Sequence, residues 1–549
     1  MKKLLSFILL ISYSIQGQNT ISTVLNTEDS FNGYTLYSPR SFEEPNLTYL
    51  INNCGEIVNQ WSSNFLAFGG DFLMEDGSLF SSHIDNKSTL VYAGITGRIE
   101  KKDWDNNLLW GFTYSDTDYS FHHDYVPLPN GNILMVVAHR LTATEAIQAG
   151  RNPSDLPEGA LYDERILEIR PVGTDSGQIV WEWRLWDHLI QDIDNTKDNF
   201  GVVGDHPELI DINYLGSSGG NGDWIHINAI DYNSELDQIV FSSRFMDEFY
   251  IIDHSTTTAE AASHTGGNSG KGGDFLYRWG NPQVYDQGSP DDRKSFGQHT
   301  VHWIPKGFPD EDKIMFFNNG QPRGFSSVDI ISPPIESNGN YLYSPGSSFE
   351  PNNPEWSYTD QNNMADFFAP FISGAYRLSN GNTLITNGPN GIITEIDSSF
   401  KKVWEYINPV SNNTILSQGT TPNNLSSFIF RSKRYEPDYA AFVGRDLTPT
   451  GYVENNPVPE NCELFDSLSI DDFELNSFFT VYPNPVLDYI NIINKTENQY
   501  EIEIFDLKGK KITALLSNDQ INISNLSSGL YILKITSQNK SLTKKIVKI

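Results

Sequence analysis

The sequence is poor in cysteine and methionine, and it has no long apolar run beyond its first residues. A membrane-spanning helix needs about 18 or more consecutive apolar residues, so no mature transmembrane helix is expected. Basic residues are also scarce, because 37 Lys and Arg stand against 70 Asp and Glu and give a formal net charge of −33. Nucleic-acid binding requires a basic face, so this class of function is excluded.

Several catalytic motifs are absent as well. The sequence contains no phosphate-cradling Walker motif, no HExxH and no nucleophile elbow. Its many Asp and Glu residues offer no pair that spacing singles out for glycoside hydrolysis. Few helices are predicted. A candidate site must therefore come from the arrangement of strands and histidines.

The N-terminal stretch MKKLLSFILLISYSIQGQ combines two lysines, an apolar run and a small residue, Gly17. This pattern predicts a secretory signal peptide over residues 1–17. In an exported chain the two cysteines, Cys54 and Cys462, are expected to form a disulfide that ties the start of the main domain to its end. Two buried free thiols are the alternative.

Tryptophans at the ends of strand-like segments mark a repeated module. Abundant Gly, Pro and Tyr favour short strands and turns. The markers lie in six segments, at Trp61, Trp110, Trp181 with Trp183, Trp279, Trp356 and Trp404. Turns such as LPNGNIL and LSNGNTL carry the Asn-Gly hairpin signal. Repeats of roughly 40 to 50 residues built from short strands predict propeller blades.

The predicted fold class is all-β: a six-bladed β-propeller followed by a small C-terminal β-sandwich. The ring would close by pairing N- and C-terminal strands, which removes open edges. Four insertions (143–164, 185–221, 256–273 and 333–364) would form loops on the faces of the ring. An ordinary pair of β-sandwiches is the alternative for the main domain.

The composition changes near the C-terminus. Residues 477–549 carry nine Lys, no Arg and six acids, a net charge of +3 that leaves −36 for the rest of the chain. We therefore expect a signal peptide at 1–17, a propeller at 18–460, an acidic linker at 461–476 and a separate all-β domain at 477–549.

Three histidines share one position in the repeat. His123 precedes the turn residue Gly131 by eight positions, and His299 precedes Gly307 by the same eight. His226 lies eight before Ser234. Because the innermost strand of each blade lines the central channel, the three imidazoles are expected to converge on the axis. His122 should point away from His123 and support the site from behind it. His302 could have the same supporting role.

The segment DWIHINAIDY around His226 alternates like a strand, which predicts Trp224, His226 and Asn228 on one face. Arg244 ends a nearby strand-like run and is expected in the channel. Imidazoles, a guanidinium and an amide can hold a tetrahedral anion such as sulfate or phosphate. One imidazole could act as nucleophile and another as acid–base. Three histidines could equally bind Zn²⁺, although the arginine weighs against a nearby metal.

The propeller resembles a known family in several segments, namely FHHDYVPLPNGNIL, GQIVWEWRLWDHLIQD, HPELIDINY, DWIHINAIDYN, FGQHTVHW and ISGAYRLSNGNTLI. From about Ser38 to Val410 the chain is similar to the arylsulfotransferase (arylsulfate sulfotransferase) family of six-bladed propellers. The resemblance implies transfer of a sulfuryl group from an aryl sulfate donor to a phenolic acceptor through a sulfated histidine. It implies ping-pong kinetics and no nucleotide donor, and we expect no cofactor and no metal.

The resemblance also suggests residue roles. His299 of GQH would be the nucleophile. His226, Asn228 and Arg244 would hold the sulfuryl oxygens, and His123 would assist proton transfer at the phenol oxygen. Candidates for substrate contacts are Trp224, His302, Asn318 and Tyr376. The aromatic residues among these could simply be core residues, and Asn318 could belong to a turn.

The C-terminal tail resembles the type A sorting domain of the type IX secretion system. The matching features are the run from Tyr482 to Pro485, the segment FDLKGK and the segment NLSSGLYILKI. This resemblance implies that the secretion machinery is a partner and that the protein is secreted or anchored at the cell surface. A carbohydrate-binding or adhesion module is the alternative.

Two other functions stay open from the residues alone. The first is a non-catalytic propeller that binds sulfated ligands or polysaccharide. The second is a metal-dependent hydrolase or lyase on the same three histidines.

Overall fold

The computed structural model describes residues 19–40, 46–85, 87–412, 414–423, 425–465, 479–495, 500–506, 510–512, 515–517, 520–537 and 540–549. The predicted signal peptide and most of the predicted linker lie outside these residues. The chain divides into two compact units, Met1–Leu464 and Phe465–Ile549.

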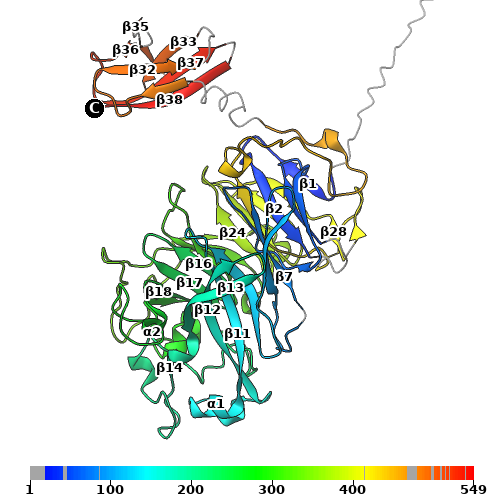
Figure 1. Ribbon diagram of the computed structural model, residues 1–549, viewed down its shortest axis with the longest axis vertical. Helices are drawn as coiled ribbons and strands as arrows, with labels where there is room; N and C mark the ends of the chain where they lie inside the picture. The colour runs from blue at the N-terminus through cyan, green and yellow to red at the C-terminus, as the bar shows by residue number, and fades with distance from the viewer. Residues whose placement is uncertain are drawn as a thin grey trace, which may run out of the picture. The chain divides into compact units, whose positions relative to one another are not determined.

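In the described part of the first unit, six antiparallel sheets of four or five strands form a β-propeller, which we number blades 1 to 6 (Figure 1). Their strands are: blade 1, β5 (Leu66–Ala67), β6 (Phe72–Leu73), β7 (Leu79–Ile84), β8 (Gly97–Lys102) and β9 (Leu108–Thr113); blade 2, β10 (Tyr119–Pro127), β11 (Ile133–Thr142), β12 (Ala160–Val172) and β13 (Ser176–Arg184); blade 3, β16 (Ile227–Asn233), β17 (Gln238–Ser243), β18 (Glu248–Asp253) and β19 (Tyr277–Trp279).

The remaining blades are: blade 4, β20 (His299–Trp303), β21 (Ile314–Asn318), β22 (Ser327–Ile331) and β23 (Trp356–Tyr358); blade 5, β24 (Gly374–Arg377), β25 (Thr383–Asn387), β26 (Ile392–Ile396), β27 (Lys402–Ile407) and β1 (Ser22–Asn26); blade 6, β30 (Ile429–Tyr435), β2 (Tyr34–Pro39), β3 (Asn46–Ile51) and β4 (Ile57–Ser63). The first strands of neighbouring blades contact one another from β10 to β16, β20, β24 and β30, so these strands lie innermost.

Strands from both ends of the propeller segment close the ring. The N-terminal strand β1 pairs with β27 at the outer edge of blade 5, and β30 pairs with β2 as the inner strand of blade 6. The strand β30 is not predicted from the sequence, because the repeat fades after Trp404. Near this closure a disulfide joins Cys54 to Cys462.

The marker tryptophans all lie on the outermost of the blade's own strands. Five of them donate the indole N–H to a backbone carbonyl of the following blade at 2.7–2.8 Å: Trp61 to Asp103, Trp110 to Ser176, Trp183 to Gly273, Trp279 to Pro351 and Trp404 to Asn53. The sixth, Trp356, instead lies under the guanidinium of Arg377 of the following blade. A buried indole N–H needs an acceptor, so these hydrogen bonds join each of the five blades to the blade that follows it.

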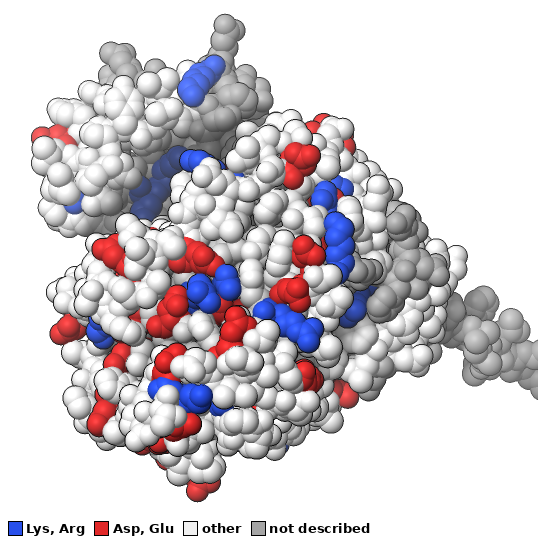
Figure 2. Space-filling model, turned by 60° about the horizontal axis from the view of Figure 1, so that its bottom comes forward, with Lys and Arg blue, Asp and Glu red and all other residues white. Residues whose placement is uncertain are grey.

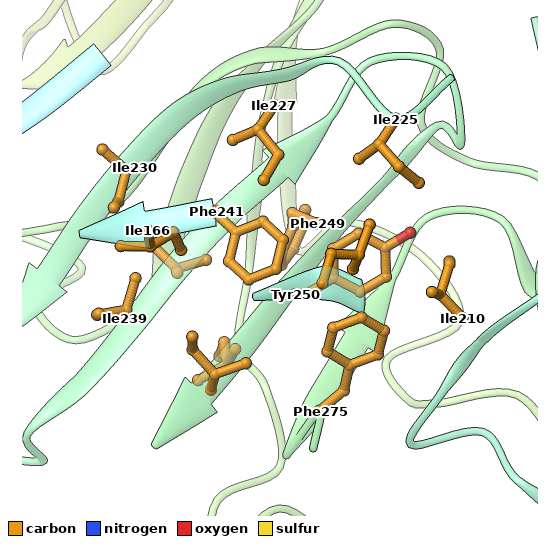
Figure 3. Packing of buried hydrophobic residues seen from close by; sticks show 14 of the residues in the cluster. Ile166, Ile210, Ile225, Ile227, Ile230, Ile239, Phe241, Phe249, Tyr250 and Phe275 are labelled. Carbon is orange, nitrogen blue, oxygen red and sulfur yellow. The ribbon is translucent and has the colours of Figure 1, made fainter. Parts of the chain in front are cut away.

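Apolar side chains fill the space between blades. Figure 3 shows this packing where Ile166 of blade 2 faces Ile227, Ile239 and Phe241 of blade 3. Alternating β-branched and aromatic residues on these strands supply the buried faces.

The insertions carry the few helices and short strands outside the blades. These are α1 (Ala143–Gln148), α2 (Thr258–Ala261), α3 (Met364–Phe367), β14 (Leu189–Ile190), β15 (Ile210–Asp211), β28 (Val410–Ser411) and β29 (Thr414–Ile415). Short 3₁₀ turns span Pro153–Asp155, Leu185–Asp187, Val203–Asp205, Pro282–Tyr285, Pro290–Asp292, Gln321–Arg323, Ala440–Phe442 and Pro459–Asn461. Two expected insertions are shorter than predicted, because β12 begins at Ala160 and β23 lies within 333–364.

The C-terminal unit is a small β-sandwich. One sheet has the order β31 (Phe479–Tyr482), β32 (Tyr489–Asn494), β36 (Gln520–Asn522) and β35 (Leu515–Ser517). The other has the order β34 (Lys511–Ile512), β33 (Glu501–Asp506), β37 (Gly529–Ser537) and β38 (Lys540–Lys548). Their facing side chains, such as Ile490, Leu533 and Ile546, form a separate core. The predicted fold class is thus confirmed.

The surface matches the charge of the sequence. On the face that Figure 2 shows, Asp and Glu side chains are interspersed with Lys and Arg and no broad basic surface gathers. None of the helices described is long and apolar enough to cross a membrane.

Candidate functional site

The inner strands share a backbone irregularity that marks the expected register. Eight residues before the turn glycines Gly77 and Gly381, Gly69 and Ser373 occupy in blades 1 and 5 the register position that the histidines occupy in blades 2 and 3. Four of the register positions have left-handed backbone angles, with φ of +109° at Gly69, +52° at His123, +57° at His226 and +87° at Ser373. In blade 4 the left-handed residue is Thr300 (φ +55°), next to His299. The strand pairing shifts at this point in blades 2, 3 and 4. Such bulges re-aim side chains at the rims of sheets and next to sites.

The bulge overturns the expected alternation around His226. The strand β16 begins only at Ile227, and Asp223–His226 precedes it without strand pairing. The left-handed angle of His226 breaks the period of two, so Trp224 does not share its face. Trp224 is buried in the core between blades and donates its indole N–H to the Tyr162 carbonyl at 3.0 Å. It is therefore not placed to flank a substrate.

Two of the three register histidines touch. The ring centroids of His123 and His226 are 4.6 Å apart in a T-shaped arrangement. His299 acts electrostatically on His123 and is itself affected by His226 and Arg244. Imidazoles from blades 2, 3 and 4 thus gather around one point with a guanidinium beside them.

The orientation of His299 is fixed by two acceptors. Its Nδ1 lies 2.7 Å from Asn319 Oδ1 and 3.0 Å from the Gly297 carbonyl oxygen. The Asn319 amide nitrogen donates to the carbonyls of Ala369 and Ile372, which sets which amide atom faces the ring. Because both partners of Nδ1 only accept, the proton stays on Nδ1 and Nε2 carries the lone pair.

All three imidazoles are held neutral. Burial, followed by the Arg244 charge, lowers the pKa of His299 to about 3. Burial and then His226 lower the pKa of His123 well below its usual value, and burial and then Arg244 do the same for His226. Desolvation disfavours the charged form of a base. His299 therefore presents a neutral, unprotonated Nε2 at neutral pH.

His226 is paired with a buried carboxyl. Its Nδ1 lies 2.6 Å from Asp223 Oδ2, and Tyr92 stacks on its ring at 5.0 Å between centroids. Burial and then the charge of Glu164 raise the pKa of Asp223 well above its usual value. Asp223 Oδ2 is thus the partner that fixes the orientation of the His226 ring through its Nδ1.

His123 lies at the end of a short chain of hydrogen-bonded side chains. Its Nδ1 is 3.1 Å from His122 Nδ1, and His122 Nε2 is 2.9 Å from Glu164 Oε2. Tyr92 also donates to Glu164. His122 therefore contacts His123 rather than pointing away from it, because the left-handed angle of His123 brings the two rings to one side.

Arg244 is available for an anion. Its backbone N–H donates to the His226 carbonyl at 3.1 Å, and its side chain passes Gly297, whose missing Cβ would lie 3.8 Å from Arg244 Cγ. Its guanidinium lies over the Phe245 ring. In the part of the chain that the structure describes, no hydrogen bond or ion pair is recorded for this guanidinium, so its N–H groups are unused.

Two asparagines predicted at the site are occupied within the fold. Asn228 donates to the Gln298 carbonyl at 2.8 Å, and its Oδ1 accepts from Ser242. Asn318 donates to the Lys294 carbonyl and accepts from the Phe296 N–H. Asn228 thus holds the backbone just before His299. The contact to the nucleophile candidate comes from Asn319, one residue beyond the predicted Asn318.

His302 and Tyr376 form a second group on the inner strands. Their ring centroids are 4.7 Å apart, and Lys433 Nζ lies 5.6 Å from the Tyr376 ring. Burial and then the charge of Arg431 lower the pKa of Lys433 to about 7. The Arg431 guanidinium pairs with Asp124 across the ring, from blade 6 to blade 2. Lys433 and Arg431 lie on the unpredicted strand β30.

Comparison with known families decides the assignment. A family model described as arylsulfotransferase (ASST) matches residues 22–424, most of the chain. The chain belongs to the arylsulfotransferase family. A model described as a secretion system C-terminal sorting domain matches residues 480–549. This domain, of the type IX kind, marks the protein for export and for a secreted or cell-surface location.

Other comparisons add little. No curated protein matches. Solved structures similar to this chain include a protein of unknown function from Bacteroides caccae (12% identity, 73% of this chain and 100% of that one, TM-score 0.38). Virginiamycin B lyase from Staphylococcus aureus is 11% identical over 69% of this chain and 86% of its own (TM-score 0.29). A Cps50 β-propeller domain from Myceliophteria thermophila is 9% identical over 72% and 88% (TM-score 0.31). These likenesses are too weak to bear on function.

Four side chains around the three register histidines were not predicted from the sequence, namely Tyr92, Glu164, Asp223 and Asn319. Tyr92 comes from the loop between β7 and β8, and Glu164 lies on the second strand outward from the histidine of its blade. Their spacing from the histidines carries no periodic signal. Asp223 and Asn319 lie within three residues of predicted site residues, and only the backbone bulge and turn place them.

A glycine in the Tyr92 loop controls the position of His123. A Cβ on Gly94 would lie 2.2 Å from the His123 ring, whereas a Cβ on Gly131 would meet nothing within 4 Å, at nearly the same φ (+89° and +85°). We expect Gly94→Ala to lower kcat/KM by about 10-fold or more, because the imidazole must move. Gly131→Ala carries the same backbone strain without the clash. Equal losses of activity at equal folded fraction would contradict this role.

Proposed function

We propose that the protein transfers a sulfuryl group from an aryl sulfate to a phenol through a covalent sulfohistidine at His299. The observation that carries the proposal is the pair of acceptors at His299 Nδ1, which hold the ring proton there and leave the lone pair on Nε2. A neutral imidazole with an oriented lone pair is an activated nucleophile. The unused guanidinium of Arg244 supplies the matching anion site.

In the first half-reaction His299 Nε2 attacks the sulfur of the donor. The N–S bond forms as the S–O(aryl) bond breaks, and the phenolate leaves with the bonding electron pair. The imidazole becomes positive while keeping its Nδ1 proton, and the oxygens of Asn319 and Gly297 stabilise that charge. Arg244 and His226 hold the sulfuryl oxygens, where negative charge is concentrated in transfer.

In the second half-reaction a phenol occupies the place of the first product. His123 Nε2 takes the phenol proton, backed by His122 and Glu164. The phenol oxygen bonds to sulfur, the N–S bond breaks, and His299 returns to its neutral form. The proton on His123 then leaves to the released phenolate or to water. This division of labour is ping-pong group transfer with a general base.

The metal-dependent alternative has less support at this place. The Nδ1 atoms of His226 and His299 already have hydrogen-bond partners, and the Arg244 cation lowers the pKa of both imidazoles. A second positive charge, as from Zn²⁺, would be repelled there.

The pH profile of the first half-reaction is expected to stay level down to about pH 5, well below the ordinary imidazole pKa of about 6.5. The neutral form of His299 is the reactive one, and its pKa of about 3 keeps it neutral over that range. The measurement is the rate of phenol release in a rapid-mixing experiment at each pH, on protein checked for folding. An acid limb near pH 6.5 would contradict the assignment.

The proposal is tested by mixing the protein with para-nitrophenyl sulfate in the absence of acceptor. We expect a burst of about one phenol per chain, and a peptide containing His299 that is about 80 Da heavier, the mass of a sulfuryl group. Adding a phenol should discharge it and yield the new aryl sulfate. Phenol release that EDTA abolishes, with no labelled histidine, would instead favour metal-dependent hydrolysis. Binding of the donor without release would favour a non-catalytic propeller.

A further inference from the structure

Two insertions of the propeller meet at a cluster of two histidines and one aspartate that the proposed transfer does not use. His188 precedes β14 in the insertion between blades 2 and 3. His264 and Asp274 lie in the loop between β18 and β19, after α2 (Figure 1). His188 is thus distant in the chain from His264 and Asp274, and the cluster joins one insertion to the other.

Their ligand atoms converge. His188 Nδ1 and His264 Nδ1 each lie 2.8 Å from Asp274 Oδ1, and all three atoms fall within 4.8 Å of one another. A tetrahedral Zn²⁺ with bonds of about 2.0–2.1 Å would separate its ligand atoms by about 3.3 Å. The two His–Asp spacings of 2.8 Å would widen by about half an ångström to admit the ion, and the two imidazole nitrogens, which lie within 4.8 Å of one another, would close on it.

The hydrogen bonding of His188 points to a cation at Nδ1. Its Nε2 lies 2.8 Å from the Ala261 carbonyl oxygen, which can only accept. A neutral imidazole has one proton, so the proton on Nε2 leaves a lone pair on Nδ1. That lone pair then faces Asp274 at 2.8 Å, and two acceptors cannot satisfy one another. A metal ion between them would satisfy both groups, since it binds the imidazole lone pair and the carboxylate oxygen alike.

The surroundings of His188 are those of a metal ligand that is held in a fixed orientation. The Trp183 ring stacks on His188 with 5.6 Å between centroids, and the imidazole is fully buried. A Cβ on Gly273 would lie 2.6 Å from His188 Nε2 and 2.0 Å from the Ala261 oxygen, so only glycine lets this hydrogen bond form. A backbone carbonyl behind a histidine fixes the ring orientation and raises the basicity of a metal ligand.

We propose that His188, His264 and Asp274 bind a Zn²⁺-type ion that clamps the two insertions together. Two imidazoles and one carboxylate suit Zn²⁺ and related transition metals rather than Ca²⁺ or Mg²⁺, which prefer oxygen ligands. The side chain of His264 is 62% exposed, so the fourth coordination position faces solvent. This site is separate from the three register histidines and does not rest on the sulfuryl-transfer proposal.

The test is a Zn²⁺ titration of the whole protein after EDTA treatment and dialysis, in competition with a chromophoric chelator. We expect one Zn²⁺ per chain and a Zn²⁺-dependent rise in Tm, because an ion that binds only the folded state stabilises it. His264→Ala should weaken the affinity about 100-fold or more and abolish that rise. Since His264 is exposed, this variant should fold.

His206→Ala is the matched control. His206 is also exposed and pairs with a carboxylate, Glu208, at 2.8 Å, but only one imidazole is present there. This variant should bind Zn²⁺ like the wild type. Absence of stoichiometric binding by the wild type, or equal affinity in His264→Ala, would overturn the proposal. Asp274 would then be only the hydrogen-bond partner of His188 and His264.

Discussion

Replacing His299 with alanine is expected to lower kcat/KM for an aryl sulfate donor by about 10⁴-fold or more, because the covalent route is lost with its nucleophile. The burst of phenol should vanish, and no peptide should gain the mass of a sulfuryl group. The fold should survive, since the ring of His299 has two hydrogen-bond partners and Asn319 keeps its own bonds to Ala369 and Ile372.

His139→Ala is a suitable control for this experiment. His139 lies in blade 2 against Tyr114 and Tyr119, and burial lowers its pKa to about 3, like that of His299. It has no part in the proposed chemistry, so its variant should retain activity near that of the wild type. If His299→Ala released phenol with an undiminished burst, the nucleophile would have to be another group.

The repeat could be found in the sequence because each blade depends on one tryptophan. The indole of Trp183, for example, bridges to the Gly273 carbonyl of the next blade, so its position in the repeat is under a physical constraint. The strand β30 has no such marker. It enters the sheet of blade 6 beside β2, which lies almost the whole chain away, and no local pattern records that pairing.

The histidine register could be predicted because the bulge lies seven or eight residues before the hairpin turn in blades 2, 3 and 4. The face of the strand on which an individual side chain lies could not be predicted. Alternation placed Trp224 beside His226, but the φ of +57° at His226 turns the chain by one position and sends Trp224 to the core. Tyr92 and Glu164 reach the histidines through tertiary packing, which no spacing reveals.

The pairing of Asn319 rather than Asn318 with His299 has a similar cause. Asn318 is the last residue of β21, and its amide is used against Lys294 and Phe296. Asn319 follows the strand and turns its Oδ1 to the imidazole. Two adjacent asparagines have equal chemistry in the sequence, and only the end of the strand distinguishes them.

Arg244→Gln is expected to lower kcat/KM for donor and acceptor alike by about 10²–10³-fold, the usual cost of removing one donor from an anion-stabilising site. Both half-reactions pass through the same sulfuryl group, so the loss should appear in each. Arg244→Lys should recover part of the activity, because the charge returns without the planar fork.

A second readout separates this role from a merely structural one. The Arg244 charge is, after burial, the largest influence that lowers the pKa of His299, so its removal should move the acid limb of the first half-reaction toward higher pH. Arg244→Lys should leave that limb near the wild-type position. If Arg244→Gln and Arg244→Lys both lose activity while the acid limb stays at the wild-type pH, the guanidinium lies away from the nucleophile. The anion site would then have to be assigned to other groups.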